Sequence, residues 1–349
     1  MTDGIAQAEP EIERERGWGR VVVGVVLFIV MPMTPVLRVL LPVDETLVLL
    51  APLLASGALV GWWVGGRLSL AALWTGLAGW ILWQFTSGRG TFALLVCGWA
   101  VLLAATFGAL SLVERRAAVA ARLFPRAMGA IGLALVLATG VAALVPPGFP
   151  AMRESVRTEV YRRADEAVQS WRQTTSTPEW TTLAADNSWA GDMARQLEQQ
   201  LKGTPEVALA LFPSLLALQS LGALALAWAM YHRVGRARLG PPLAPLRDFR
   251  FSDQFVWGLI AGLVMVVVPG LGALSTFGAN LLVFFGVVYA LRGMGVLLWF
   301  LAPGRLVMAL LVTFAVLFWH VLGVFALGLG LGDTWLDWRA RARQNAHKS

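Results

Sequence analysis

The sequence predicts an all-α fold: a polytopic helical integral membrane protein with eight to nine transmembrane helices. Of the 349 residues, 57% are apolar and only 14% are charged, whereas soluble domains average about 25% charged residues. The apolar residues gather in long runs, and a bilayer core of about 30 Å needs such runs for a helix to cross it. The runs are apolar throughout, whereas the strands of a membrane barrel would alternate polar and apolar residues.

Nine apolar runs, bounded by charged residues, proline or glycine, are the candidate spans. They cover residues 21–41, 46–65, 68–85, 91–113, 127–145, 207–231, 255–268, 277–302 and 306–331. The first run is too long for the core of a signal peptide and no small-residue cleavage site follows it, so we expect it to be a retained span. The run 255–268 is short for a crossing. Nine crossings are the first interpretation, and eight full crossings with a re-entrant or paired seventh run are the alternative.

The distribution of arginine predicts a cytoplasmic amino terminus in a bacterial cytoplasmic (inner) membrane. With this orientation most arginines of the short connections face the cytoplasm, and the short outer loops contain only Arg38 and Arg89. Basic residues in short loops favour the cytoplasmic side. The tail, with Arg339, Arg341 and Arg343, prefers that side too, which requires an even number of crossings.

The chain divides into a membrane part before and a membrane part after a polar insert. Apolar residues of the insert recur every three or four positions, as on one helical face: Val156, Val160, Ala164, Val168 and Trp171. Thr177-Pro178 resembles a helix start, and residues 193–201 indicate a second short helix. The insert is either a lid or partner-binding module, or a pair of interfacial helices that joins the two bundles. The predicted regions are a polar cytoplasmic amino terminus (1–20), a first membrane bundle of five spans (21–145), an extracytoplasmic amphipathic helical insert (146–206), a second membrane bundle of three to four spans (207–332) and a basic tail (333–349).

Polar side chains inside apolar runs are costly, and each is therefore a candidate for function. Arg292 lies deep in the run 277–302, about 18 Å along a helix from Asn280. His320 and Gln219 lie near the middle of the ninth and sixth runs. One hypothesis places these four residues around a polar cavity for an anionic or polar solute, with Arg292 supplying charge and a planar donor fork. The alternative breaks the helix at residues 292–295, so that Arg292 reaches the interface and His320 hydrogen-bonds between helices.

A second candidate is a motif at the membrane boundary that follows the last run. Two carboxylates four residues apart suggest acid–base chemistry or a cation site. The alternative is an interfacial anchor with a local ion pair. In the loop before the seventh run, Ser252 and Asp253 are positioned to cap the next helix. The residues of the boundary motif are Asp333, Trp335, Asp337 and Arg339.

Several classes of function are not expected. The sequence has no phosphate-binding loop, no dinucleotide-binding glycine pattern and no motif of a zinc or serine hydrolase. Its one cysteine, Cys97, excludes an intramolecular disulfide framework, and three histidines argue against a histidine-built metal site. The basic residues form no stripe with interleaved aromatics, as nucleic-acid binding would need. We therefore expect no catalytic residue, cofactor, metal or nucleic-acid partner, and no enzyme.

Three stretches of the second half carry a family resemblance. Residues 280–282 read Asn-Leu-Leu, residues 289–296 read Tyr-Ala-Leu-Arg-Gly-Met-Gly-Val, and residues 329–339 read Leu-Gly-Leu-Gly-Asp-Thr-Trp-Leu-Asp-Trp-Arg. In these stretches the chain resembles the YybS-like predicted bacterial membrane proteins, a domain of unknown function with the same layout of spans around a polar insert. The first half of that family is similar to the substrate-binding membrane components of energy-coupling-factor transporters, which implies transport by analogy of fold alone.

Two functions lead, and a third is weaker. The first is a solute-binding protein of transporter type with a site between the helical halves. The second is a non-transporting cell-envelope partner or scaffold that uses the insert and the cytoplasmic loop 233–254. A membrane enzyme acting on lipid would need clustered carboxylates or histidines, and only Asp333 and Asp337 qualify. The expected partners are the lipid bilayer, a small polar or anionic solute and another membrane protein.

Overall fold

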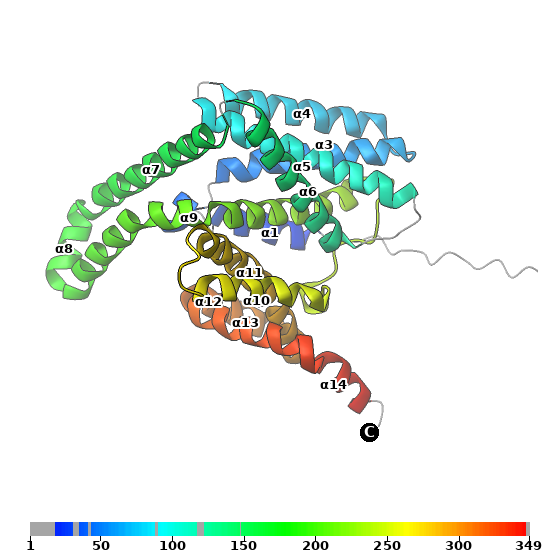
Figure 1. The fold of residues 1–349 in the computed structure, drawn as a ribbon. Helices are drawn as coiled ribbons and strands as arrows, with labels where there is room; N and C mark the ends of the chain where they lie inside the picture. The colour runs from blue at the N-terminus through cyan, green and yellow to red at the C-terminus, as the bar shows by residue number, and fades with distance from the viewer. Residues whose placement is uncertain are drawn as a thin grey trace, which may run out of the picture.

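The computed structural model describes residues 18–30, 35–40, 43–87, 90–116, 122–146 and 148–346. Within these residues all regular secondary structure is helical, which confirms the all-α prediction. Figure 1 shows helices packed side by side and a helical arm that extends from one end of the bundle. Most of the predicted polar amino terminus, Arg89 and the last residues of the basic tail lie outside the described residues.

The first bundle is built from four long apolar helices and confirms four of the predicted runs to within a few residues. Alanines such as Ala100, Ala127 and Ala130 are fully buried and allow neighbouring backbones to approach closely, as is usual between helices in membranes. Gly65, with φ +95°, ends the first of the four in the left-handed conformation that glycine adopts at low cost. The helices are α3 (Val43–Trp63), α4 (Leu68–Thr86), α5 (Gly90–Arg116) and α6 (Leu123–Leu144).

The described residues of the first apolar run form two helical segments, and residues 31–34 between them lie outside the described part of the structure, so a single span over 21–41 stays a prediction. The run contains α1 (Gly19–Val30) and α2 (Pro35–Leu40). Pro35 begins α2, and the fixed φ of proline suits the first position of a helix. α1 packs against α3 and α9, whereas α2 packs against α9 and the arm.

The polar insert forms the arm. α7 (Gly148–Thr175) carries the predicted apolar face, since Val160, Ala164 and Val168 are buried in one cluster with Leu201 of the returning helix. At the tip, the hydroxyl of Thr177 caps α8 (Pro178–Asp186) by accepting a hydrogen bond from the backbone N–H of Trp180. The predicted helix face and helix start are both confirmed. Figure 1 shows the arm extending away from the bundle rather than lying across it.

The returning helix of the arm continues through the bundle. α9 (Ser188–Val234) has 47 residues, about 70 Å at 1.5 Å per residue. It includes both the predicted short helix at 193–201 and the apolar run 207–231, so the prediction of two separate elements is wrong. Proline usually interrupts a helix, yet Pro205 and Pro213 lie inside α9. α9 packs against α3, α6 and α11 (Ala273–Leu301) and therefore contacts both halves of the protein.

The second bundle differs from the predicted runs in two places. α11 passes through residues 292–295 without a break, so the alternative of a helix break there is wrong. The ninth run is divided at Phe318, whose backbone angles (φ −122°, ψ 38°) are not helical, and the prediction of one span over 306–331 is also wrong. The remaining elements are η2 (Leu246–Asp248), η3 (Asp253–Phe255), α10 (Val256–Val267), α12 (Arg305–Leu317), α13 (Trp319–Leu336) and α14 (Trp338–Ala346).

Six helices of the described residues are long and apolar enough to cross a membrane: Asp44–Trp63, Leu68–Thr86, Gly90–Glu114, Leu123–Leu144, Ser188–Val234 and Ala273–Leu301. Two further apolar helices, Asp253–Val267 and Val321–Leu336, are shorter. The chain is thus a membrane protein with several apolar helices, and the number of eight to nine crossings stays a prediction. Below, the end from which the arm extends is called the arm end, and the end occupied by the loop 235–255 is called the loop end.

Candidate functional site

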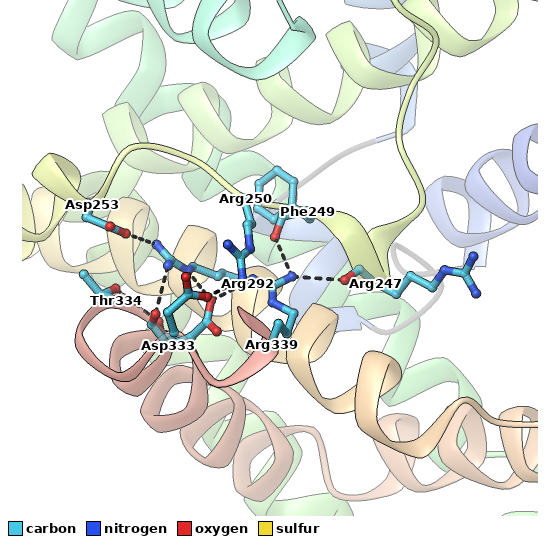
Figure 2. Close-up of polar contacts among 10 residues, drawn as sticks. Arg247, Phe249, Arg250, Asp253, Arg292, Asp333, Thr334 and Arg339 are labelled. Atoms are coloured by element: carbon cyan, nitrogen blue, oxygen red, sulfur yellow. Dashed lines mark hydrogen bonds and ion pairs between the residues drawn. The ribbon is translucent and has the colours of Figure 1, made fainter. Parts of the chain in front are cut away.

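Arg292 lies in a buried cluster of arginine and aspartate at the loop end. Its Nε donates to Asp333 Oδ2 at 3.0 Å and its Nη2 to the Asp333 carbonyl at 3.2 Å. Its Nη1 donates to Asp253 Oδ1 at 2.6 Å. Figure 2 shows this guanidinium held between the two aspartates. The Arg292 side chain is 4% exposed and that of Asp333 is 0% exposed, so the pair is almost completely shielded from solvent.

Arg339 approaches Asp333 from the opposite side. Its Nη2 donates to Asp333 Oδ2 at 2.7 Å, and its Nη1 donates to the carbonyls of Arg247 and Phe249. Asp333 Oδ1 and Arg339 Nε have no hydrogen-bond partner among the described residues. Two arginines thus share one buried aspartate, and the second aspartate, Asp253, balances their charge. A buried charge needs such pairing because desolvation is expensive.

Two glycines bring the helices of this cluster close enough for the contact. A Cβ on Gly293 of α11 would lie 1.7 Å from the Ala326 carbonyl oxygen of α13, and a Cβ on Gly330 would lie 2.0 Å from the Tyr289 carbonyl oxygen. In the run 323–332, Gly330 therefore acts as a helix-packing residue, whereas a Cβ on Gly323 or Gly328 would meet no atom within 4 Å. This close approach places Arg292 directly beside Asp333.

The other residues of the boundary motif lie around the cluster. Asp337, in the left-handed conformation (φ 39°) between α13 and α14, pairs with Arg250 at 2.5 Å. Trp335 is exposed. Asp333 and Asp337 thus face different arginines and do not form one carboxylate pair. Asp253 binds Arg292 and does not cap α10, whose N-cap is Phe255 without a side-chain hydrogen bond, so the predicted cap by Ser252 and Asp253 is wrong.

Asn280 and Gln219 have partners of their own. The Asn280 amide accepts from the Ser214 N–H at 3.0 Å and donates to the Ala210 carbonyl at 2.7 Å, which ties α11 to α9. Gln219 Nε2 donates to Thr46 Oγ1 at 2.9 Å and ties α9 to α3. His320 lies at the start of α13, and its side chain lies outside the described part of the structure. The contacts of Arg292, Asn280 and Gln219 therefore lie in three different places.

A polar cleft at the arm end is the second candidate site, and the sequence does not single it out. The cleft has a volume of about 780 Å³ and lies where α7 leaves the bundle beside α2 and the start of α3. Phe85 and Phe92 contribute aromatic surface. Its charged lining consists of Arg38, Asp44, Glu45, Glu159, Arg162, Arg163 and Glu166.

An ion-pair network forms one wall of this cleft. Arg163 donates to Glu45 at 2.6 Å and to Glu159 at 2.8 Å, and its guanidinium lies 4.9 Å from the centre of the Phe92 ring. Arg162 donates to both oxygens of Glu159 and to Glu166. Burial raises the pKa of the Glu159 carboxyl, but the hydrogen bonds and charges of Arg162 and Arg163 outweigh burial and hold that pKa below its usual value. The Glu159 carboxylate is thus charged at neutral pH.

Neither polar site has the composition of a metal centre. Among the residues that the structure describes, no group of three or more histidine, cysteine, aspartate or glutamate side chains is arranged to hold a metal ion. Glu45, Glu159 and Glu166 of the cleft and Asp253 and Asp333 of the cluster are instead bound to arginine. The arrangement suits recognition of charged groups by ion pairs and hydrogen bonds.

The comparison with known protein families finds a match in the second half of the chain. Residues 167–334 match the model of a family described as "Predicted membrane protein (DUF2232)". The match begins within α7 and ends one residue after Asp333, so it covers most of the arm, the whole of α9 and much of the buried cluster. Among curated proteins and solved structures, none matches the chain. Residues 167–334 are thus similar to a membrane domain of unknown function, in agreement with the apolar helices.

Proposed function

We propose that this membrane protein binds a small polar solute in the cleft at the arm end, as a transporter or a solute receptor would, without catalysing a reaction. The observation that carries the proposal is the cleft itself. Its volume of about 780 Å³ lies in the range of about 300–1,000 Å³ that is typical of small-molecule sites. Its lining combines several charged groups with two aromatic rings.

The contacts at Arg292 favour a structural role for the buried cluster. All three nitrogens of the Arg292 guanidinium donate to aspartate or backbone oxygens. An anionic solute would have to displace Asp253 or Asp333 from that guanidinium. Neither the cleft nor the small pocket lined in part by Glu45, Arg163 and Gln219 borders Arg292. Solute binding by Arg292, Asn280, His320 and Gln219 stays a prediction, which the cleft replaces as our first choice.

The orientation of the chain is part of the proposal. We expect the arm end to face the outside of a bacterial inner membrane and the loop end, with its many arginines, to face the cytoplasm. The cleft then opens towards incoming solute. Beneath it, a pocket of about 10 Å³, lined in part by Glu45, Arg163 and Gln219, lies on the bundle side of the same ion pair.

A cysteine-protection experiment tests the site. Ser170 lines the cleft, whereas Ser176 is exposed near the tip of the arm. Single cysteines at the two positions, in a Cys97→Ala background, are labelled with a membrane-impermeant thiol reagent in intact cells. We expect a mixture of small polar solutes to slow labelling at 170 and leave labelling at 176 unchanged. Equal rates with and without solutes at both positions would contradict solute binding in the cleft.

A second candidate function is that of a cell-envelope partner or scaffold. The arm favours it, because the tip exposes Leu183, Trp189 and Met193 (37%, 57% and 43%), and exposed aromatic anchors are common in protein interfaces. The test is cross-linking of the full chain in cells from a cysteine at Gln196. A defined cross-linked product that Trp189→Ala abolishes would support docking at the tip, and a product that Trp189→Ala leaves unchanged would count against it.

A further inference from the structure

The arginines of the cleft differ in whether they already bind carboxylates. Glu159 accepts from both Arg162 and Arg163, and these arginines also bind Glu166 and Glu45. The arginines of the α7 wall are therefore already engaged with carboxylates. Within this wall the pair of Arg163 and Glu45 is nearly buried, with side chains 14% and 7% exposed.

Arg38 differs from the other two arginines of the lining. It lies on α2, is exposed, and makes no ion pair with any residue that the structure describes. Its guanidinium keeps its donors for an anionic group, and carboxylate and phosphate both fit the planar donor fork. The cleft thus has one available cationic group, and this group lies on a different helix from the carboxylate-rich wall.

The balance of charge argues against a ligand of one sign. The lining holds four carboxylates and three guanidinium groups. A purely anionic solute would meet Arg38 but also the field of the carboxylates, and a purely cationic solute would leave Arg38 without a partner. A molecule that carries an ammonium group and an anionic group can satisfy both sides at once. Phe85 and Phe92 also line the cleft and offer apolar contact to the part of the ligand between the two charges.

We propose that the cleft binds a small zwitterion, with the anionic group at Arg38 and the ammonium group at the exposed carboxylate of Glu166, on the wall where the three carboxylates of Glu45, Glu159 and Glu166 outnumber the two guanidinium groups of Arg162 and Arg163. This inference rests on the proposed function and adds the class of ligand to it. The same chemistry occurs in free amino acids and in the headgroup of phosphatidylethanolamine. The two sources differ in whether the ligand reaches the cleft from water or from the bilayer.

Calorimetry on the purified full-length protein in detergent tests the class of ligand with two matched sets of probes. Glycerophosphoethanolamine is compared with its cationic half, ethanolamine, and its anionic half, glycerol 3-phosphate. γ-Aminobutyrate is compared with butylamine and butyrate. We expect at least one zwitterion to bind about tenfold more tightly than both of its halves, as one extra charge-assisted contact would give.

Variants assign the anionic group to Arg38. Arg38→Ala should weaken zwitterion binding about tenfold and leave ethanolamine binding unchanged, and Arg38→Lys should retain most of the affinity. Arg172→Ala is the matched control, because Arg172 is an exposed arginine of α7 that pairs with Glu198 and does not line the cleft. Its zwitterion affinity should equal that of the wild type.

Nanodiscs then identify the source. If the natural ligand is a lipid headgroup, nanodiscs of phosphatidylethanolamine should abolish binding of the free zwitterion, whereas nanodiscs of phosphatidylglycerol should not. If it is a free solute, binding should be the same in both.

Two results would overturn the inference and are distinguishable. Halves that bind as tightly as the zwitterions, with the anionic half sensitive to Arg38→Ala, would retain solute binding in the cleft and reject the zwitterion. No binding of any probe, together with unprotected labelling at position 170, would reject both.

Discussion

The side-chain amide of Asn280 in α11 accepts a hydrogen bond of 3.0 Å from the backbone N–H of Ser214 in α9 and donates one of 2.7 Å to the carbonyl of Ala210. Ser214 and Ala210 are four residues apart, the pair that an α-helix joins by a backbone hydrogen bond. Pro213, which lies between them, cannot donate. The Asn280 amide of the second bundle thus hydrogen-bonds the two backbone groups that flank Pro213 in α9, the helix that packs against both bundles.

Removing this amide should destabilise the protein. We expect Asn280→Ala to lower the free energy of unfolding by about 1–3 kcal/mol, since it removes the partner of two backbone groups in an apolar surrounding. Thermal unfolding in detergent measures the change. Asn187→Ala is the control, because that half-buried side chain bonds only to the Leu183 carbonyl of its own turn, and its effect should stay within about 0.5 kcal/mol. Equal melting temperatures of the two variants would reject the coupling role of Asn280.

The two aspartates that bind Arg292 should differ strongly in their contribution to stability. Asp333→Asn leaves Arg292 and Arg339 buried around an uncharged group, and breaking a buried pair costs about 3–5 kcal/mol. Asp253→Asn should cost about 1 kcal/mol or less, because the Asp253 side chain is 61% exposed and solvent screens its charge. Thermal unfolding of both variants in the same detergent compares them. If Asp253→Asn loses as much stability as Asp333→Asn, the argument that burial determines the effect is wrong.

The sequence allows the helical elements to be predicted where the local pattern is decisive. Charged and glycine-rich boundaries define α3 to α6, and Thr177-Pro178 defines the start of α8. The pattern misleads where tertiary contacts override it. Pro205 and Pro213 suggest an interrupted helix, yet α9 continues through both, and at Pro213 the Asn280 amide from a distant part of the chain serves the neighbouring backbone groups.

The sites are less predictable than the helices because their residues are far apart in the chain. Arg292 can be singled out as a charge inside an apolar run, but its partner Asp333 is 41 residues away. Glu45 and Arg163 are 118 residues apart, and both lie beside polar neighbours that make them unremarkable in a single sequence. The cleft forms only when the arm packs against α2 and α3, and no spacing of residues in the sequence predicts that tertiary contact.

The contacts at the loop end also predict the side on which the tail lies. Arg250 pairs with Asp337, and Arg339 binds the carbonyls of Arg247 and Phe249. These segments must therefore lie on the same side of the membrane, with an even number of crossings between them. On parity, this agrees with the alternative of eight crossings and not with nine.

Cysteine accessibility checks this arrangement. Single cysteines at Arg247 and Arg341, both exposed, should escape an impermeant thiol reagent in intact cells and react after permeabilisation. A cysteine at Ser176 on the arm should react in intact cells. Labelling of 247 and 341 from opposite sides would contradict the packing of the tail against the loop.

Acid should weaken the attachment of the arm in a way that depends on Glu159. The hydrogen bonds and charges of Arg162 and Arg163 hold the folded-state pKa of Glu159 below its usual value, against the effect of burial. A lowered folded-state pKa means that the stabilisation is complete above the unfolded-state pKa of about 4.3 and is lost as the pH falls through the folded-state value. Melting temperatures from pH 7 to pH 3, followed by tryptophan fluorescence, should therefore fall more steeply for the wild type than for Glu159→Gln. Glu179→Gln, an exposed change on α8, should keep the wild-type slope; an unchanged slope in Glu159→Gln would mean that other carboxylates determine the acid response.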